Sequence, residues 1–144
     1  MKLLGIRIAL AGSLLACPSF AQNSSAMPEK TFRAGAHRVD ISPEKFPVIV
    51  NAMFTERSAT NVVDRLFAKA LVLDDGQTRV ALCVVDTCMM TRDLIDRAKD
   101  LAAKTTGIPT SRMCISATHT HSAPSAMACL GSRVDPDYVA SLPP

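Results

Sequence analysis

Two apolar runs face each other across a short polar turn in the middle of the chain. The first covers residues 66–73 and the second covers residues 78–85, with an Asp-Gly pair at 75–76 in the turn between them. An Asp-Gly pair tolerates the positive φ angles that tight hairpin turns require, so the pattern predicts an antiparallel β-hairpin. Residues 32–41 alternate loosely and stop before Pro43, which predicts an earlier strand.

After this hairpin the apolar positions change from the period of a strand to the period of a helix. Thr91 is a suitable first residue, and Gly107 stands where a C-terminal cap is expected. The spacing therefore predicts an amphipathic helix of roughly three to four turns. The apolar positions that recur at helical spacing are Leu94, Ile95, Ala98, Leu101 and Ala102.

A short apolar run at residues 113–117 follows the helix and predicts a buried strand. Strand, helix and strand in this order predict a βαβ unit, which joins parallel strands with a right-handed sense. A further helix is expected to begin at Pro136, and the prolines at 143–144 stop it early. The predicted fold class is α/β: a mixed sheet with an antiparallel hairpin followed by a right-handed βαβ unit, in a domain that we expect to be incomplete.

Polar residues follow both of the predicted parallel strands. Asp86 comes after the first strand and His119 after the second. Because the carboxyl ends of parallel strands share one edge of a sheet, and open α/β sheets bind ligands at that edge, we expect a site there. Asp86 is predicted either to orient His119 or a bound water, or to cap the helix that begins near Thr91.

The start of the chain has the pattern of a secretory signal peptide. Basic residues precede an apolar run at residues 8–16, and the small residues that follow predict cleavage after Ala21. Lipidation of Cys17, as in a lipoprotein, is the less favoured alternative. We therefore expect an exported protein, either periplasmic or secreted. The expected boundaries are those of a signal peptide, a flexible leader and a folded part: 1–21, 22–31 and 32–144.

The charge balance is mild. The sequence has 16 basic and 13 acidic side chains, a net charge of +3, and removal of residues 1–21 takes away two basic side chains and leaves +1. So small a charge gives no reason to expect nucleic acid as a partner. No apolar run reaches the roughly 20 residues of a bilayer span, so no transmembrane segment is predicted, and contact with a membrane surface is expected to be transient at most. The oligomeric state stays open.

Four cysteines follow the expected cleavage site. In an oxidising compartment they can pair, and four cysteines allow three connectivities. Two of them, Cys83 and Cys114, lie in apolar runs, where a free cysteine packs as a small hydrophobic side chain. A structural role is preferred over a zinc–thiolate site because the chain has no Cys-x-x-Cys pair. The four are Cys83, Cys88, Cys114 and Cys129.

Two histidines, His119 and His121, lie directly after the second predicted parallel strand. In extended backbone, residues i and i+2 point the same way, so both rings can address one point in space. Such a pair can bind Zn²⁺ through ring nitrogens at about 2.0–2.1 Å and leave a position for water. The alternative is a pair of surface or hydrogen-bonded histidines, and the spacing alone leaves both interpretations open.

The residues around this pair resemble a known family. Residues 117–124, Ala-Thr-His-Thr-His-Ser-Ala-Pro, are similar to the Thr-His-Thr-His-Ser-x-Pro signature of the neutral/alkaline non-lysosomal ceramidases. Residues 35–43 resemble the Gly-x-x-x-x-Asp-Ile-x-Pro segment that opens that family, and residues 66–73 and 84–86 resemble its following strands. The resemblance covers residues 32 to about 125, and after its proline this chain has Ser-Ala-Met where the family has glycines.

The resemblance implies a zinc-dependent amidohydrolase that splits the N-acyl bond of ceramide or a related lipid amide. It implies Zn²⁺ as cofactor and a ceramide-like lipid as substrate. His119 corresponds to a zinc ligand, and His121 corresponds to a catalytic residue that contacts substrate near the metal. The family's remaining ligands, a histidine, a glutamate and a tyrosine, and its active-site serine have no counterpart that can be assigned in this chain. We therefore expect an incomplete active site that is inactive by itself.

Three other residues are weaker candidates. His37 is predicted to be structural or exposed, Ser122 has no recognisable base or oxyanion arrangement for a nucleophile, and Tyr138 is predicted to be a packing residue. The alternative function is a secreted, non-catalytic α/β binding or interaction domain that cysteine pairing stabilises. A third interpretation is a truncated gene product without independent stability.

Overall fold

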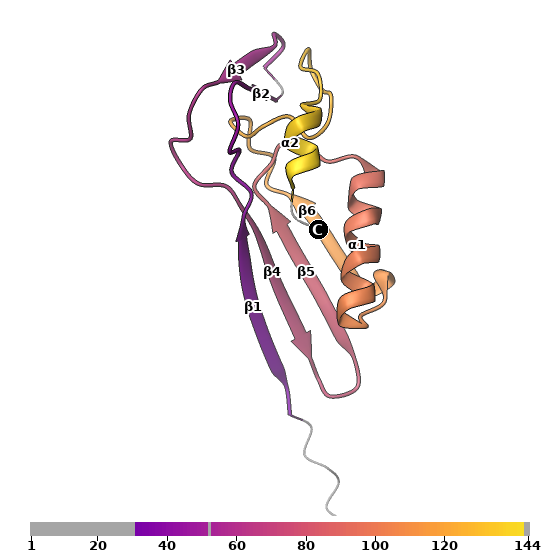
Figure 1. Cartoon of the computed structure of the whole chain (residues 1–144). Helices are drawn as coiled ribbons and strands as arrows, with labels where there is room; N and C mark the ends of the chain where they lie inside the picture. Colours follow the sequence, from indigo (N-terminus) through magenta and orange to yellow (C-terminus); the bar gives the residue numbers. More distant parts are fainter. Residues whose placement is uncertain (1–30, 52, 143–144) are drawn as a thin grey trace, which may run out of the picture.

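The chain folds as a four-stranded mixed sheet with one long helix beside it (Figure 1). The computed structural model describes residues 31–51 and 53–142. The expected signal peptide and all but the last residue of the expected leader lie outside these residues. The order of strands in the sheet is β1–β4–β5–β6, and β2 and β3 form a separate hairpin. The elements are β1 (Arg33–Asp40), β2 (Val48–Val50), β3 (Arg57–Ala59), β4 (Phe67–Asp74), β5 (Arg79–Val85), α1 (Arg92–Thr106), η1 (Thr110–Arg112), β6 (Met113–Ala117) and α2 (Pro136–Ser141).

The central hairpin forms where the sequence predicts it. Strands β4 and β5 pair antiparallel over most of their length. The Asp75 carboxylate accepts the backbone N–H groups of Gln77 and Thr78 at 2.9 and 2.7 Å, and Gly76 has a φ of 85°, so the turn uses the chemistry that its residues offer. Strand β1 pairs antiparallel with β4, which confirms the earlier strand.

The βαβ unit is also confirmed. The Thr91 side chain accepts the N–H of Leu94, and Gly107 ends α1 in the left-handed conformation with a φ of 70°. Strand β6 then pairs parallel with β5, and Val85 lies opposite Ala117. Because this pair of residues is the last in each strand, β5 and β6 end level with each other.

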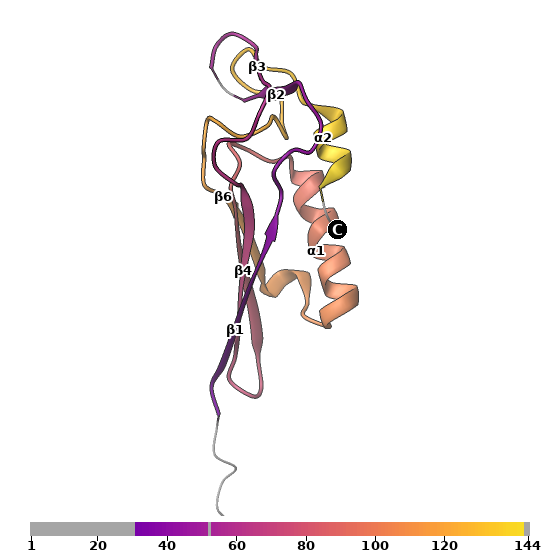
Figure 2. The ribbon, with the colours of Figure 1, turned by 60° about the vertical axis from the view of Figure 1, so that its left-hand side comes forward.

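Strand β6 is not the buried strand that the sequence suggested. Only Met113 is buried, whereas Cys114 and Ser116 are exposed. Strand β6 lies at an edge of the sheet, and the helices lie on one side of it only (Figure 2). The prediction was wrong because a short apolar run does not reveal whether one or both faces of its strand are covered.

The most deeply buried residues lie around the end of the sheet where β5 and β6 finish. Val48 of β2, Ala126 and Tyr138 of α2 form a packed cluster there. None of the residues of α1 is fully buried, and the same is true of β1, β4 and β5. The β2–β3 hairpin and α2 gather at this end of the molecule (Figure 1), so the tightest packing surrounds the loops that follow β5 and β6.

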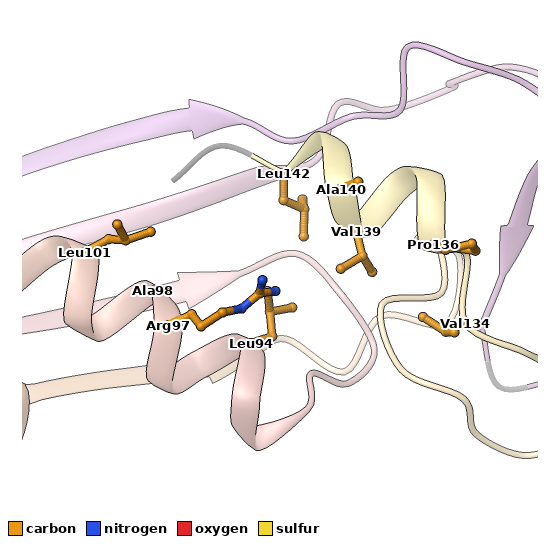
Figure 3. Close-up of a pocket in the computed structure, with 9 residues that line it drawn as sticks. All are labelled: Leu94, Arg97, Ala98, Leu101, Val134, Pro136, Val139, Ala140 and Leu142. Atoms are coloured by element: carbon orange, nitrogen blue, oxygen red, sulfur yellow. The ribbon is translucent and has the colours of Figure 1, made fainter.

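Helices α1 and α2 meet across a shallow apolar groove of about 540 Å³ (Figure 3). Leu94 and Leu101 line it from α1, and Val139 lines it from α2. Leu94 and Val139 also pack against the buried cluster, which connects the two helices to it. Among the helices of the described ranges, none has both the length and the apolar character needed to cross a bilayer.

Candidate metal centre

The loops that follow β5 and β6 lie against each other. The N–H of Thr118 donates to the carbonyl of Val85 at 2.9 Å, and the N–H of Thr120 donates to the carbonyl of Thr87 at 3.2 Å. These two bonds continue the parallel pairing of β5 and β6 past the ends of both strands. They bring the His119 loop to the segment that contains Cys88.

The rings of His119 and His121 converge on one point. Their Nε2 atoms lie 3.1 Å apart, and their ring centroids lie 4.7 Å apart with an interplanar angle of 81°. The backbone does not achieve this in the extended conformation that the i, i+2 spacing suggested, because His119 has a φ of 62°. The expected convergence is present, but a turn produces it.

The left-handed backbone conformation of His119 is locally unfavourable, so contacts of the neighbouring residues must maintain it. Such a conformation costs an L-residue roughly 1–2 kcal/mol, although histidine adopts it more often than most residues do. The two hydrogen bonds on either side of His119, from Thr118 and Thr120, fix the turn. Residues in rare backbone conformations that their surroundings hold in this way are found more often at functional sites than elsewhere.

A backbone carbonyl sets the tautomer of His119. Its Nδ1 lies 3.1 Å from the carbonyl oxygen of Cys88. Because a carbonyl can only accept, Nδ1 carries the proton, and Nε2 of the neutral ring presents its lone pair towards His121. Metal-binding histidines are commonly oriented by this arrangement, in which the second ring nitrogen donates to a carbonyl.

Cys88 joins the two histidines in one cluster. One ligand atom from each of Cys88, His119 and His121 lies within 4.8 Å of the other two, and the Cys88 Sγ is 3.7 Å from His119 Nδ1. Two imidazoles and a thiol are ligand types that zinc binds, so the donor set fits this metal. Cys88 is 1% exposed, and its burial raises the pKa of the thiol, with a smaller contribution from Cys129. The thiol is therefore protonated at neutral pH in the absence of a metal.

The sequence analysis missed Cys88 as a candidate ligand. The four cysteines of the described residues are free, so the pairing considered for them is not present. The absence of a Cys-x-x-Cys pair argues against a zinc–thiolate site made of cysteines alone, but it says nothing about a ligand set that combines cysteine with histidine. The available signal was position: Cys88 lies three residues after the end of β5, at the same edge of the sheet as His119.

Asp86 neither contacts His119 nor caps α1. Its carboxylate accepts the N–H of Phe67 at 3.0 Å and binds the ammonium group of Lys69 at 2.9 and 3.1 Å. Thr91 caps α1 instead. Asp86 follows β5 directly and bonds back to the neighbouring strand β4, so its carboxylate is used to hold these two strands together.

Strands β2 and β3 support the histidine loop from another side. Arg57 of β3 donates through Nη2 to the carbonyl of His121 at 3.1 Å. Beyond the histidines, Ser125 donates its N–H to Ile49 at 2.7 Å, and Asn51 donates its N–H to Ala123 at 3.2 Å. Sequence analysis did not identify Arg57, because its contact joins residues that are 64 positions apart.

The weaker candidates lie as follows. His37 is exposed in β1, and Ser122 is exposed with its hydroxyl 3.3 Å from that of Thr120. Tyr138 is a packing residue, as predicted: it is 4% exposed and donates its hydroxyl to the carbonyl of Ile41 at 2.9 Å. Burial raises the pKa of Tyr138 far above its usual range, so the hydroxyl stays protonated.

Comparison with known proteins supports the fold. The chain superposes on the crystal structure of neutral ceramidase from Pseudomonas aeruginosa with a TM-score of 0.60 and 24% identity, over 67% of this chain and 16% of that one. It matches a structure of ceramidase complexed with C2 with a TM-score of 0.57 and 24% identity, over the same shares. No protein-family model and no curated protein sequence matches the chain. The fold thus resembles part of a neutral ceramidase, and the chain spans about 16% of the length of these structures.

Proposed function

We propose that this chain carries part of the active site of a zinc-dependent hydrolase, which splits the N-acyl amide bond of ceramide or a related lipid amide. In this proposal His119 binds Zn²⁺, and His121 contacts the substrate beside the metal as a catalytic residue. The protein is exported by means of residues 1–21 and reaches its lipid substrate through transient contact with a membrane surface.

The observation that carries the proposal is the convergence of the two histidine rings. A zinc ion bound to His119 Nε2, at about 2.0–2.1 Å from it, would lie beside a second ring whose Nε2 is close to that of His119. The Nε2 atoms of His119 and His121 are 3.1 Å apart. This geometry occurs at the carboxyl end of two parallel strands, in a fold that resembles part of neutral ceramidase.

The residues of this chain have distinct tasks in the proposal. The Cys88 carbonyl holds the Nδ1 proton of His119, which keeps the Nε2 lone pair directed at the site. Arg57 holds the backbone of His121 through its carbonyl, so the second ring stays beside the first. A bound zinc ion supplies polarisation of a carbonyl oxygen or activation of a water molecule.

The ligand count limits what this chain does alone. Catalytic zinc sites normally have three protein ligands and one open position. His119 alone is two ligands short of that number, and the chain spans about 16% of the length of the ceramidase structures. The proposed activity is therefore that of the whole enzyme, to which this chain contributes the histidine loop.

The experiment measures zinc content and fatty acid release together. The 144-residue chain and the longest protein encoded by the same reading frame are purified, and both are assayed with a short-chain ceramide. We expect about one zinc ion per molecule of the longer protein, with fatty acid release that a chelator abolishes and added zinc restores. His119→Asn should lose both properties, whereas His121→Asn should keep zinc and lose release.

His37→Asn serves as the matched control, because His37 is exposed in β1, outside the histidine cluster. It should leave both properties unchanged. A longer protein that is folded, free of zinc and inert towards the lipid amide would overturn the proposal.

A further inference from the structure

The resemblance to ceramidases gives Cys88 no role, yet its side chain lies in the same cluster as the two histidines. We propose that Cys88 supplies a thiolate ligand to the metal that His119 binds beside His121. The inference rests on the proposed zinc centre and adds a sulfur ligand to it. The chain then provides two protein ligands of its own, His119 and Cys88.

The spacing of the ligand atoms fits a mixed site. A tetrahedral zinc ion with nitrogen at about 2.0–2.1 Å and sulfur at about 2.3 Å places these atoms roughly 3.3–3.6 Å apart. The contacts in the cluster are 3.1 Å between the two histidine Nε2 atoms and 3.7 Å between Cys88 Sγ and His119 Nδ1. All three ligand atoms lie within 4.8 Å of one another, and the sulfur must move from the Nδ1 side of the ring to reach a metal at Nε2.

The sulfur approaches His119 on the side of Nδ1, whereas the nitrogen that faces His121 is Nε2. Rotation of the Cys88 side chain about its first torsion moves the sulfur along the ring while the backbone stays in place. The Cys88 carbonyl continues to hold His119 Nδ1 during this rotation. The bond from Thr120 to the carbonyl of Thr87 keeps the segment beside the histidine loop.

The surroundings of Cys88 favour a bound ion over a free thiol. Cys88 is 1% exposed, whereas His119 is exposed, so the thiol would reach the metal from the protein side and leave the other side open to solvent. The neighbouring Thr87 hydroxyl is buried and has no hydrogen-bond partner in the described part of the chain, which costs roughly 1–3 kcal/mol unless a polar group is supplied. Metal binding would replace the S–H bond of Cys88 with a metal–sulfur bond, and the proton would leave to solvent.

The His119 nitrogen and the Cys88 sulfur are then two of the three protein ligands that catalytic zinc sites normally use. A thiolate is also a softer ligand than the oxygen ligands that the ceramidase resemblance implies. The centre should therefore bind thiophilic divalent metals well, cobalt(II) among them.

Cobalt(II) spectroscopy tests the inference, because a cobalt–thiolate bond gives a charge-transfer absorption in the near ultraviolet that nitrogen ligands do not give. The protein used is the full chain in which Cys17, Cys83, Cys114 and Cys129 are all replaced by serine, so that Cys88 is the only thiol. We expect the band to appear on titration and to saturate at about one cobalt per chain.

Cys88→Ser in the native background should lose the band and bind cobalt at least about 100-fold more weakly, a larger loss than the 10–100-fold typical of groups that only orient a ligand. Cys129→Ser is the matched control, and it should keep both band and affinity. Circular dichroism of each variant confirms that it is folded.

Two results would overturn the inference, and they are distinguishable. Cobalt binding to the single-thiol protein without a charge-transfer band would exclude Cys88 as a ligand and leave the proposed His119 centre standing. Absence of any cobalt binding by the folded native chain would remove the inference, whereas the zinc content of the longer protein decides whether the proposed zinc centre stands. The first result is read on protein that retains Cys88, so it does not depend on how well Cys88→Ser folds.

Discussion

His119 must satisfy two conditions at once, because its ring has to meet His121 and its backbone has to adopt a φ of 62°. Asparagine tolerates that backbone, whereas a β-branched residue does not. We expect His119→Asn to weaken zinc binding at least about 100-fold, since a ligand matters more than the outer groups worth 10–100-fold. His119→Val should have the same effect on zinc and should also lower the free energy of unfolding by roughly 1–2 kcal/mol.

Isothermal titration with zinc and urea unfolding of the metal-free protein measure the two effects separately. Equal stability of the asparagine and valine variants would show that the left-handed conformation imposes no constraint on residue 119.

Glu56 forms an ion pair that makes stability depend on pH. Its carboxylate accepts from the backbone N–H, Nε and Nη2 of Arg133 at 3.1, 2.9 and 2.7 Å. These bonds lower the pKa of Glu56 from 4.5 to about 2. Because the pKa is lower in the folded state, the pair stabilises the protein above pH 4.5, and this contribution disappears as the pH falls towards 2. Glu56→Gln should therefore show a smaller loss of thermal stability over this interval.

Melting curves of both proteins at a series of pH values provide the measurement. If the two lose stability in parallel as the pH falls, the ion pair with Arg133 is not the source of the dependence.

At the scale of residues, the sequence predicts chemistry that depends on near neighbours. The histidine pair and the two ends of α1 could be identified because their partners lie within a few positions. Cys88 and Arg57 could not, because each meets the histidine loop across a large separation, 31 and 64 positions respectively. Asp86 was misassigned for the same reason, since its partners lie on β4 and not on the helix that follows it.

Among the secondary-structure elements, those with a long periodic pattern were predicted, and so were the shorter β6 and α2, whereas β2 and β3 were not. The β4–β5 hairpin and α1 have enough residues to establish a period of two or of 3.6. Strands β2 and β3 have three residues each, and no pattern of that length distinguishes a strand from a loop. Strand β2 is held by contacts with residues 123–125, which lie far along the chain.

Two glycines have a left-handed backbone conformation, Gly107 at the end of α1 and Gly131 in a loop. Their replacement by alanine tests how tightly the surroundings constrain each position. Gly107 ends α1 with a φ of 70°, and a methyl group there would touch nothing within 4 Å. Gly131 has a φ of 83°, and a methyl group there would overlap the Phe54 backbone, including its carbonyl carbon at 2.8 Å. Gly107→Ala should cost roughly 1 kcal/mol from backbone strain alone. Gly131→Ala should cost more, because the Phe54 backbone must also move.

Urea unfolding of the two alanine variants beside the native chain gives the comparison. A larger effect at Gly107 than at Gly131 would mean that the loop near Phe54 accommodates the added methyl group without cost.

For the whole molecule, the sequence predicted the mixed sheet and its βαβ unit but not where the interior lies. That location depends on how the last helix returns to an early strand. One oxygen of Asp135 accepts the N–H of Tyr138 at the start of α2, and the other accepts the N–H of Ile49 in β2, both at 2.9 Å. Such a connection over 86 positions has no local signature in the sequence.

The region around the histidine loop is packed more tightly than α1, and this difference should affect local motion. Asn51 and Ser125 are completely buried beside the histidine loop, whereas α1 contains no fully buried side chain. Amide protons exchange slowly where local opening is costly, so the N–H groups of Asn51, Ser125 and Asp135 should exchange with deuterium more slowly than that of Ala98 in α1. Exchange followed by nuclear magnetic resonance measures these rates, and faster exchange around Ser125 would contradict the expectation. Local opening of α1 would then leave the rings of His119 and His121 in the same position relative to each other.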